Sequence, residues 1–330
     1  MSWWRELKSF RRVCERLQGT PWKAGLVIAT CSALAIGCVS INLRPGPAPF
    51  QETRLDGEGR DKILLIDIAG FISSAPQGNK VLGEEEPSLV SNVSEIIKKA
   101  EADRRIRAVI LRINSPGGTV TASDTIYHEL WAYKQRTRVP MVAQITDLGT
   151  SGAYYIAQAA DTIIAQPTTV TGSIGVIMVR PAVNGLLAKI GVEAAEITSG
   201  PYKAMGSPLR PLNDDERRLF QAVIDDLYGR FVATVAAGRP QLSADRIKTL
   251  SDGRIYTAEQ AKESGLIDQI GYLNDAIARA KTAANLSQAR LVTYSRPGQY
   301  KGSIYAGPVV NLDLGALGLE EAGFLYLWRP

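Results

Sequence analysis

The stretch AVILRINSPGG, residues 108–118, is an apolar run that ends in a turn signal. The six residues from Ala108 to Ile113 predict a strand, and the NSPGG that continues from them stops it. A second run of this kind, KILLIDI, occupies residues 62–68 and ends just before Gly70. Neither run alternates with polar residues over its length, so we expect two buried strands.

Three further strand candidates follow these two runs, and helical patterns lie between the candidates. The candidates are residues 141–145, 162–166 and 174–179, and the helical patterns cover residues 88–103 and 123–137. Strands that alternate with helices along the chain are typical of an α/β domain with mainly parallel pairing.

A longer helix is predicted at residues 214–237, with Asn213 or Asp214 as its N-cap. Apolar residues recur on one of its faces, which predicts a core or interface helix. They are Leu219, Val223, Ile224, Leu227, Phe231 and Val235. Two shorter helices are expected between residues 257 and 286.

Composition limits the class of protein. With 330 residues, 45% of them hydrophobic, the chain can form one large domain or two small ones, and it is neither a disordered tail nor a disulfide-stapled miniprotein. Residues 1–23 hold six basic and two acidic residues, which is most of the formal net charge of +5. The rest of the chain is too nearly neutral to form a basic groove, so nucleic acid is not expected as a partner.

Cysteine and histidine are scarce. Cys14, Cys31 and Cys38 all precede residue 39, so the rest of the chain has neither a disulfide nor a cysteine nucleophile. The single histidine, His128, lies in the helical pattern YHELWAY and is interpreted as a helix-surface residue. A multi-histidine metal site is excluded, and we find no motif for a metal or an organic cofactor.

Residues 24–43, AGLVIATCSALAIGCVSINL, carry no charge. As a helix, about 20 residues span the hydrocarbon core of a bilayer. Basic residues precede the run, so the positive-inside rule places residues 1–23 in the cytoplasm. We therefore expect a single-pass anchor in the cell (inner) membrane, with the remaining chain on the periplasmic or extracytoplasmic side. A cleaved signal peptide and a lipid-attachment site at Cys38 are alternatives, although the run is long for the first and Ala35 fits the second poorly.

The segments on either side of the expected domain differ in character. Residues 44–61 are rich in Pro, Gly and charge and have no apolar periodicity, which predicts a linker to a domain at residues 62–285. The C-terminal segment, residues 286–330, ends in the apolar cluster Phe324–Trp328, which is too short to span a membrane. That cluster can dock on the domain, on a neighbouring subunit or at the bilayer surface.

Ser151 follows a predicted strand and precedes the helix-like AYYIAQAA, so its hydroxyl can stand on a tight turn at a helix N-terminus. Unpaired amides at such a turn favour developing negative charge. The amide of Gly152, together with that of Gly118 in SPGG, would complete an oxyanion hole. Ser115 precedes a proline and is interpreted as a turn residue rather than as a second nucleophile.

A serine nucleophile needs a base, and histidine is effectively absent. The candidate is Lys203, acting as in Ser-Lys variants of the serine hydrolase mechanism. A lysine must be neutral to accept a proton, which requires an apolar, desolvated site. Pro201, Tyr202 and Met205 provide uncharged neighbours for it. Tyr154 and Tyr155 are expected to pack in the core or to line a groove, and Asp147 is interpreted as a cap or a solvated loop charge.

Four segments, in this order and spacing, resemble the signal peptide peptidase family of serine proteases, called SppA or S49. They are INSPGG at 113–118, TSGAYYIA at 150–157, TGSIGVI at 171–177 and YKAMGSPLRPLNDDER at 202–217. The later GRIYTAEQAKESGLIDQIG is also similar to that family, and the resemblance spans roughly residues 62–280.

The resemblance implies a role for each matching residue. Ser151 matches the nucleophile, Lys203 the general base and Ser173 a serine that orients the lysine, while Gly118 and Gly152 match the oxyanion-hole donors. It also implies the ClpP/crotonase-like fold, built of ββα units. In the family, the serine and the lysine of one site come from adjacent subunits or from two repeats of a longer chain. This chain has one repeat, so a homo-oligomer with shared sites is expected.

The expected function is that of a membrane-anchored serine endopeptidase that degrades residual signal peptides or other membrane-associated peptides. A catalytically inactive oligomeric scaffold or peptide-binding relative is the non-enzymatic alternative. A crotonase-type enzyme, which would stabilise an acyl-CoA enolate on the same fold, is the other enzymatic one.

Overall fold

The computed structural model describes residues 48–76, 87–297, 303–304 and 323–328. The predicted cytoplasmic segment at 1–23 and the predicted membrane span at 24–43 lie outside these ranges. Within them, no helix combines the length and the apolar character that crossing a bilayer requires.

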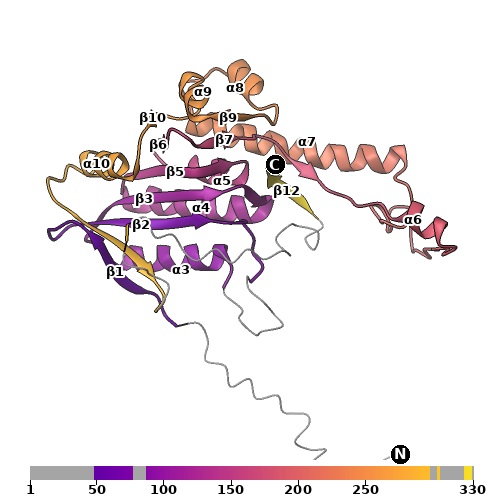
Figure 1. Cartoon of the computed structure of the whole chain (residues 1–330), viewed down its shortest axis with the longest axis horizontal. Helices are drawn as coiled ribbons and strands as arrows, with labels where there is room; N and C mark the ends of the chain where they lie inside the picture. The colour runs from indigo at the N-terminus through magenta and orange to yellow at the C-terminus, as the bar shows by residue number, and fades with distance from the viewer. Residues whose placement is uncertain (1–47, 77–86, 298–302, 305–322, 329–330) are drawn as a thin grey trace, which may run out of the picture. The chain divides into compact units, whose positions relative to one another are not determined.

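A mainly parallel sheet forms the middle of the domain (Figure 1). Its central strands, in spatial order, are β2 (Lys62–Ala69), β3 (Ile106–Ser115), β5 (Met141–Thr150) and β6 (Thr162–Ala165). Neighbours in this series are parallel. Each strand coincides with one of the apolar runs, so these four strand predictions are confirmed to within a few residues.

Helices cover both faces of this sheet. They are α3 (Leu89–Ala102), α4 (Val120–Thr137) and α10 (Leu273–Ala283). Along β2, Leu64 and Ile66 belong to the apolar cluster that contains residues of α3 and α4, whereas Ile63 and Leu65 belong to the cluster with α10. Because both faces are buried, the strands appear in the sequence as continuous apolar runs.

Two strands outside the expected domain of residues 62–285 extend the sheet. β11 (Arg290–Ser295) pairs in parallel with β2, and β1 (Gln51–Asp56) pairs antiparallel with β11, which makes the sheet mixed. The expectation of a linker over residues 44–61 is therefore wrong for β1. None of the residues of β1 is buried, so this strand has no apolar run that could mark it in the sequence.

The predicted long helix is α7 (Asp214–Gly238), and a capping box between Asn213 and Glu216 fixes its start. Only the second half of its apolar face enters the core. Phe231 and Val235 are fully buried, whereas Leu219 and Val223 are 43% and 42% exposed. The first half of α7 and the short α6 (Asn184–Lys189) extend beyond the sheet (Figure 1).

Smaller elements complete the domain around the end of β5. They are α5 (Gly152–Ala157), β7 (Val170–Gly172), α8 (Ala244–Leu250), β9 (Ile255–Thr257), α9 (Ala258–Glu263) and β10 (Gln269–Ile270). β7 pairs with β5 and β9, and β10 pairs with β6. The two short helices expected between residues 257 and 286 correspond to α9 and α10.

A second, three-stranded sheet joins segments that are far apart in the sequence. Its strands, in order, are β4 (Gly117–Thr119), β12 (Phe324–Leu327) and β8 (Ile177–Met178). The strand expected at 174–179 is thus short and lies outside the main sheet, because the chain turns at Ser173, whose φ is +51°. The C-terminal apolar cluster docks on its own domain, one of the three places left open by the sequence.

Candidate active site

Ser151 lies at the turn between β5 and α5, with φ 53° and ψ −119°. A residue with a side chain rarely adopts this conformation, which costs about 1–3 kcal/mol. Hydrogen bonds on both sides hold the turn: the Ser151 amide donates to the Gly172 carbonyl at 2.7 Å, and its carbonyl accepts from the Tyr155 amide at 2.9 Å. Strained backbone conformations cluster at active sites, so this turn is a candidate site on its geometry as well as on its sequence.

The amide of Gly118 faces away from the main sheet. On the sheet side of β4, the Thr119 amide donates to the Ile72 carbonyl at 2.8 Å, and the Ile72 amide donates to the Gly117 carbonyl at 2.9 Å. Backbone groups alternate sides along a strand, so the amide of the intervening Gly118 points to the opposite side.

Gly152 brings a second amide to the same place. It is the first residue of α5, and the first amides of a helix have no partner within the helix. A carbon added to Gly152 would lie 3.3 Å from the Gly118 nitrogen and would clash with the Ser123 hydroxyl. The structure therefore brings Ser151, Gly118 and Gly152 together, and a side chain at Gly118 would overlap the backbone of Ile72.

Ser173 lies next to Ser151. β7 pairs with β5 in parallel so that Gly172 lies opposite Thr150, and the two serines are the next residues along each strand. Ser173 is buried, and its amide donates to the Arg254 carbonyl at 2.8 Å. It is thus placed where it could contact a group that approaches the nucleophile.

Lys203 of the same chain is remote from this cluster, and its side chain is exposed. Arg210 joins the carbonyl of the next residue, Ala204, to the carboxylate of Glu216 in the first turn of α7. Phe231, which packs on Tyr155 of α5, lies 15 residues further along α7, about 22 Å along the helix axis. Among the residues that the structure describes, Lys203 of one chain therefore lacks the desolvated setting that a lysine base requires.

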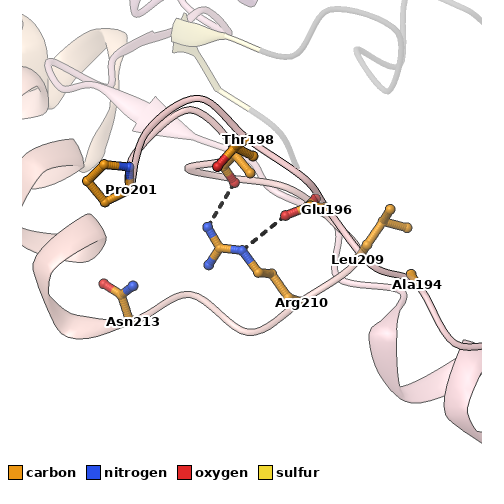
Figure 2. A pocket seen from close by; sticks show the side chains of 8 residues that line it. Ala194, Glu196, Thr198, Pro201, Leu209, Arg210 and Asn213 are labelled. Atoms are coloured by element: carbon orange, nitrogen blue, oxygen red, sulfur yellow. Dashed lines mark hydrogen bonds and ion pairs between the residues drawn. The ribbon is translucent and has the colours of Figure 1, made fainter.

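Residues 180–213, which we call the arm, contain Lys203, and ion pairs of Arg210 stabilise this segment. Arg210 forms a bidentate pair with the fully buried Glu216 at 2.5 and 3.0 Å and contacts Glu196 at 3.2 Å. The hydrogen bond from Arg210 keeps the pKa of Glu216 below its usual value. Figure 2 shows Arg210 reaching towards Glu196 across a pocket of about 280 Å³, which Thr198 and Pro201 also line.

Large hydrophobic side chains are exposed along the arm and the first half of α7. They are Leu186, Ile190, Val192, Ile197, Tyr202, Leu209, Leu219 and Val223. Ile197 is fully exposed, at 102% of its reference area. Exposed apolar surface that is gathered on one segment is typical of an interaction site.

The other residues that the sequence singled out have structural roles or lie at the surface. The Ser115 hydroxyl accepts from the Gly117 amide at 3.1 Å, as expected of a turn residue. His128 and Asp147 are exposed, as expected. Tyr154 and Tyr155 are fully buried, and burial raises the pKa of Tyr155 to about 12 while its hydroxyl donates to Asp124 at 2.6 Å.

The sequence did not reveal the part that β12 plays at this site. The Tyr326 ring packs against the rings of Tyr155 and Phe231, and β12 lies beside the Gly117–Thr119 strand. The aromatic residues of the C-terminal segment are the one sequence feature that indicates docking, and they do not indicate the surface on which the segment docks. One chain thus offers a serine hydroxyl beside two amides, with the candidate base elsewhere.

Comparisons with known proteins identify similar chains. A family model described as "Peptidase family S49" matches residues 133–287. A protein of Enterococcus faecium named "Putative signal peptide peptidase SppA" is 36% identical over 244 residues, which are 74% of this chain and 70% of that protein. The chloroplastic serine protease SPPA of Arabidopsis thaliana is 34% identical over 276 residues, 80% of this chain and 39% of that protein. Among solved structures, a mutant of the 1510-N membrane-bound stomatin-specific protease is 17% identical with a TM-score of 0.40, covering 68% of this chain and 86% of that one.

Proposed function

Because the chain belongs to peptidase family S49, we propose that it is a serine endopeptidase in which Ser151 is the nucleophile and Lys203 of a neighbouring copy is the general base. The observation that carries this proposal is the separation of Ser151 from Lys203 within one chain. Ser151 lies beside the amides of Gly118 and Gly152, whereas Lys203 of the same chain is exposed on the arm. A second copy is the natural source of the missing base.

The proposed reaction uses this chain's groups in two steps. Neutral Lys203 takes the proton of the Ser151 hydroxyl as the oxygen attacks a peptide carbonyl, and the amides of Gly118 and Gly152 stabilise the oxyanion. The peptide C–N bond then breaks, and the lysine returns the proton to the leaving amine. Water, deprotonated by the same lysine, then attacks the acyl-enzyme, the ester bond to Ser151 breaks, and the lysine returns the proton to the Ser151 oxygen.

The surface of the arm supports a shared site. Its exposed hydrophobic residues would be buried in a contact between copies, and that burial would remove water from the lysine beside them. Desolvation favours the uncharged form of a lysine, which is the form that a base requires. Ser173, next to Ser151, would then orient the incoming amine.

We extend the proposal to the substrate, the membrane and the fold. The names of the Enterococcus and Arabidopsis relatives support residual signal peptides, or other membrane-associated peptides, as substrates. The charge-free run at 24–43 and the basic residues before it support an inner-membrane anchor with the catalytic domain outside the cytoplasm. The parallel order of β2, β3, β5 and β6 supports a ClpP/crotonase-like fold.

Mixing two inactive variants tests the shared site. Full-length Ser151→Ala and Lys203→Ala chains are each expected to lose peptide hydrolysis by about a thousandfold or more. When the two variants are co-assembled, a site that takes its serine from one chain and its lysine from the other is complete. Hydrolysis and labelling of Ser151 by a fluorophosphonate should therefore return in the mixture.

A matched variant controls for the loss of positive charge on the arm. Lys189→Ala removes another exposed lysine, at the end of α6, and should leave both hydrolysis and labelling intact. Activity of Lys203→Ala alone would remove this lysine from the mechanism. A folded oligomer whose Ser151 never takes the label would favour the scaffold interpretation instead.

A further inference from the structure

Three residues of the candidate site have a left-handed backbone. The φ values of Ser151, Gly172 and Ser173 are 53°, 86° and 51°. Glycine adopts such values freely, whereas a residue with a side chain is strained by them. A strained turn persists only where the surrounding structure holds it. The two serines therefore need a support that fixes their backbone.

The segment from Arg254 to Tyr256 supports both serines. It contains the start of β9, which pairs antiparallel with β7. Just past this pairing, the Ser173 amide donates to the Arg254 carbonyl at 2.8 Å. Gly172, the last residue of β7, accepts a hydrogen bond from the Ser151 amide at 2.7 Å. The position of β9 therefore decides where β7 lies, and β7 holds the nucleophile turn.

The ring of Tyr256 lies against the backbone of Gly172. A carbon added to Gly172 would be 2.5 Å from Cδ2 of that ring, closer than non-bonded atoms approach, so the ring fills the space of a side chain at this position. Tyr256 is buried, and its hydroxyl donates at 2.9 Å to the carbonyl of Leu250 at the end of α8. Burial raises the pKa of Tyr256, so the hydroxyl remains a neutral donor. The ring is thus fixed between Gly172 and α8.

Hydrogen bonds also anchor the turn between α8 and β9. The Tyr228 hydroxyl on α7 donates to the Ser251 carbonyl at 2.7 Å. Ser251 is 1% exposed, and its own hydroxyl donates to the Ile247 carbonyl at 2.7 Å. The ring of Tyr256 therefore contacts Gly172 from a support that two helices hold in place.

The Ser151 hydroxyl depends on this support for its position. Ser151 is 1% exposed, and in the part of the chain that the structure describes its hydroxyl has no hydrogen-bond partner. The backbone of the turn, rather than a bond of the hydroxyl itself, therefore sets where the oxygen lies. If the strained turn relaxed, the oxygen would move away from the amides of Gly118 and Gly152.

We infer that Tyr256 is a positioning residue for the proposed reaction. Its ring holds Gly172, whose carbonyl holds the amide of Ser151, and this keeps the Ser151 oxygen beside the two candidate oxyanion-hole amides. The inference rests on the proposed function, since it takes Ser151 as the nucleophile. Tyr256 acts within the chain that supplies the serine, and Lys203 of the neighbouring copy does not depend on it.

The first test compares Tyr256→Leu with Tyr294→Leu in the full chain. The two tyrosines are matched, because each is 8% exposed and belongs to the same apolar cluster, but Tyr294 lies on β11, whose partners are β1 and β2. Tyr256→Leu should lower kcat about tenfold to a hundredfold, because a small displacement of a reacting atom has an effect of this size, and should change KM less than about threefold. Tyr294→Leu should keep its kcat. Equal kcat values in the two variants would overturn the inference.

A conservative variant tests whether the ring is the part of Tyr256 that acts. Tyr256→Phe keeps the ring against Gly172 and removes only the hydrogen bond to the Leu250 carbonyl. Its kcat, and its rate of labelling at Ser151 by a fluorophosphonate, should stay within about threefold of the unmodified chain. A loss as large as that of Tyr256→Leu would mean that the ring does not hold the nucleophile turn.

Mixed assemblies separate positioning from folding. Tyr256→Leu is added either to the Lys203→Ala chain, which supplies Ser151, or to the Ser151→Ala chain, which supplies Lys203. Hydrolysis by the mixture should fall about tenfold or more in the first case and stay within about threefold in the second. Equal losses would mean that Tyr256 serves folding or assembly, which overturns the inference and leaves the proposed function standing.

The unaltered mixture of Ser151→Ala and Lys203→Ala chains shows whether the proposed function itself fails. If this mixture stays inactive while the unmodified chain hydrolyses peptides, the shared site is wrong, and the comparison of Tyr256→Leu with Tyr294→Leu decides the inference alone. An unmodified chain that neither hydrolyses peptides nor takes the label at Ser151 refutes both.

Discussion

Replacing Gly118 by alanine puts a methyl group where the backbone of Ile72 already lies. The ideal position of that carbon is 2.6 Å from both the nitrogen and the carbonyl carbon of Ile72, closer than non-bonded atoms approach. β4 must therefore shift, and the Gly118 amide moves with it. If this amide is one of two donors to the oxyanion, its loss costs about 3 to 4 kcal/mol of transition-state stabilisation, or a factor of about 10² to 10³ in kcat.

The assay is steady-state hydrolysis of a reporter peptide by the full chain, with unfolding in urea measured in parallel. Gly229→Ala is the matched control, because Gly229 is exposed on α7 and a carbon added there meets no atom within 4 Å. The control should keep its kcat. A Gly118→Ala chain that is folded and retains kcat to within about threefold would refute the assignment of this amide to the oxyanion hole.

Three further predictions concern stability and the arm. Burial works to raise the pKa of Asp103, but hydrogen bonds from Lys62 and Arg105 lower it to about 2. Folding therefore favours the charged form of Asp103. About 1–2 kcal/mol of the free energy of unfolding that is present above pH 4 should be lost as the pH falls through 2. Urea unfolding at a series of pH values measures this loss, and Asp103→Asn, which has no carboxylate to protonate, should not show it. Gly229→Ala should raise the free energy of unfolding by about 0.5–1 kcal/mol, because glycine is a poor helix former in an exposed helix interior. Arg210→Lys breaks the bidentate pair with Glu216, so brief chymotrypsin digestion should cut after the exposed Tyr202 faster than in the unchanged chain.

The strands and the long helix could be predicted because their signals are local. β2 and β3 are buried on both faces, so each appears as an unbroken apolar run, and α7 has both an apolar face and a capping residue. β1 has no such signal. It lies at the sheet edge, and only its partner β11 makes it a strand. Pairing between segments more than 200 residues apart leaves no local mark, so the sequence does not predict that β1 and β11 extend the sheet beyond residues 62–285.

The same distinction applies to the candidate site. Ser151 and Gly152 are consecutive, and the turn at Gly118 directly follows a strand that the sequence predicts. Each turn is therefore encoded by a few neighbouring residues, and a short motif is enough to predict it. The role of β12 depends on which edge a distant segment chooses, and the apolar residues of Phe324–Trp328 suit any apolar partner. The surroundings of the Lys203 side chain are harder to predict, because the sequence of one chain does not show which residues of a second copy would lie beside it.

The exposed position of Lys203, away from Ser151 of the same chain, predicts that activity depends on assembly. If Lys203 comes from a neighbouring copy, the number of complete sites depends on association, so activity per chain should rise with chain concentration until assembly is complete. Activity per chain that stays constant over the concentration range in which the oligomer dissociates would mean that each chain completes its own site.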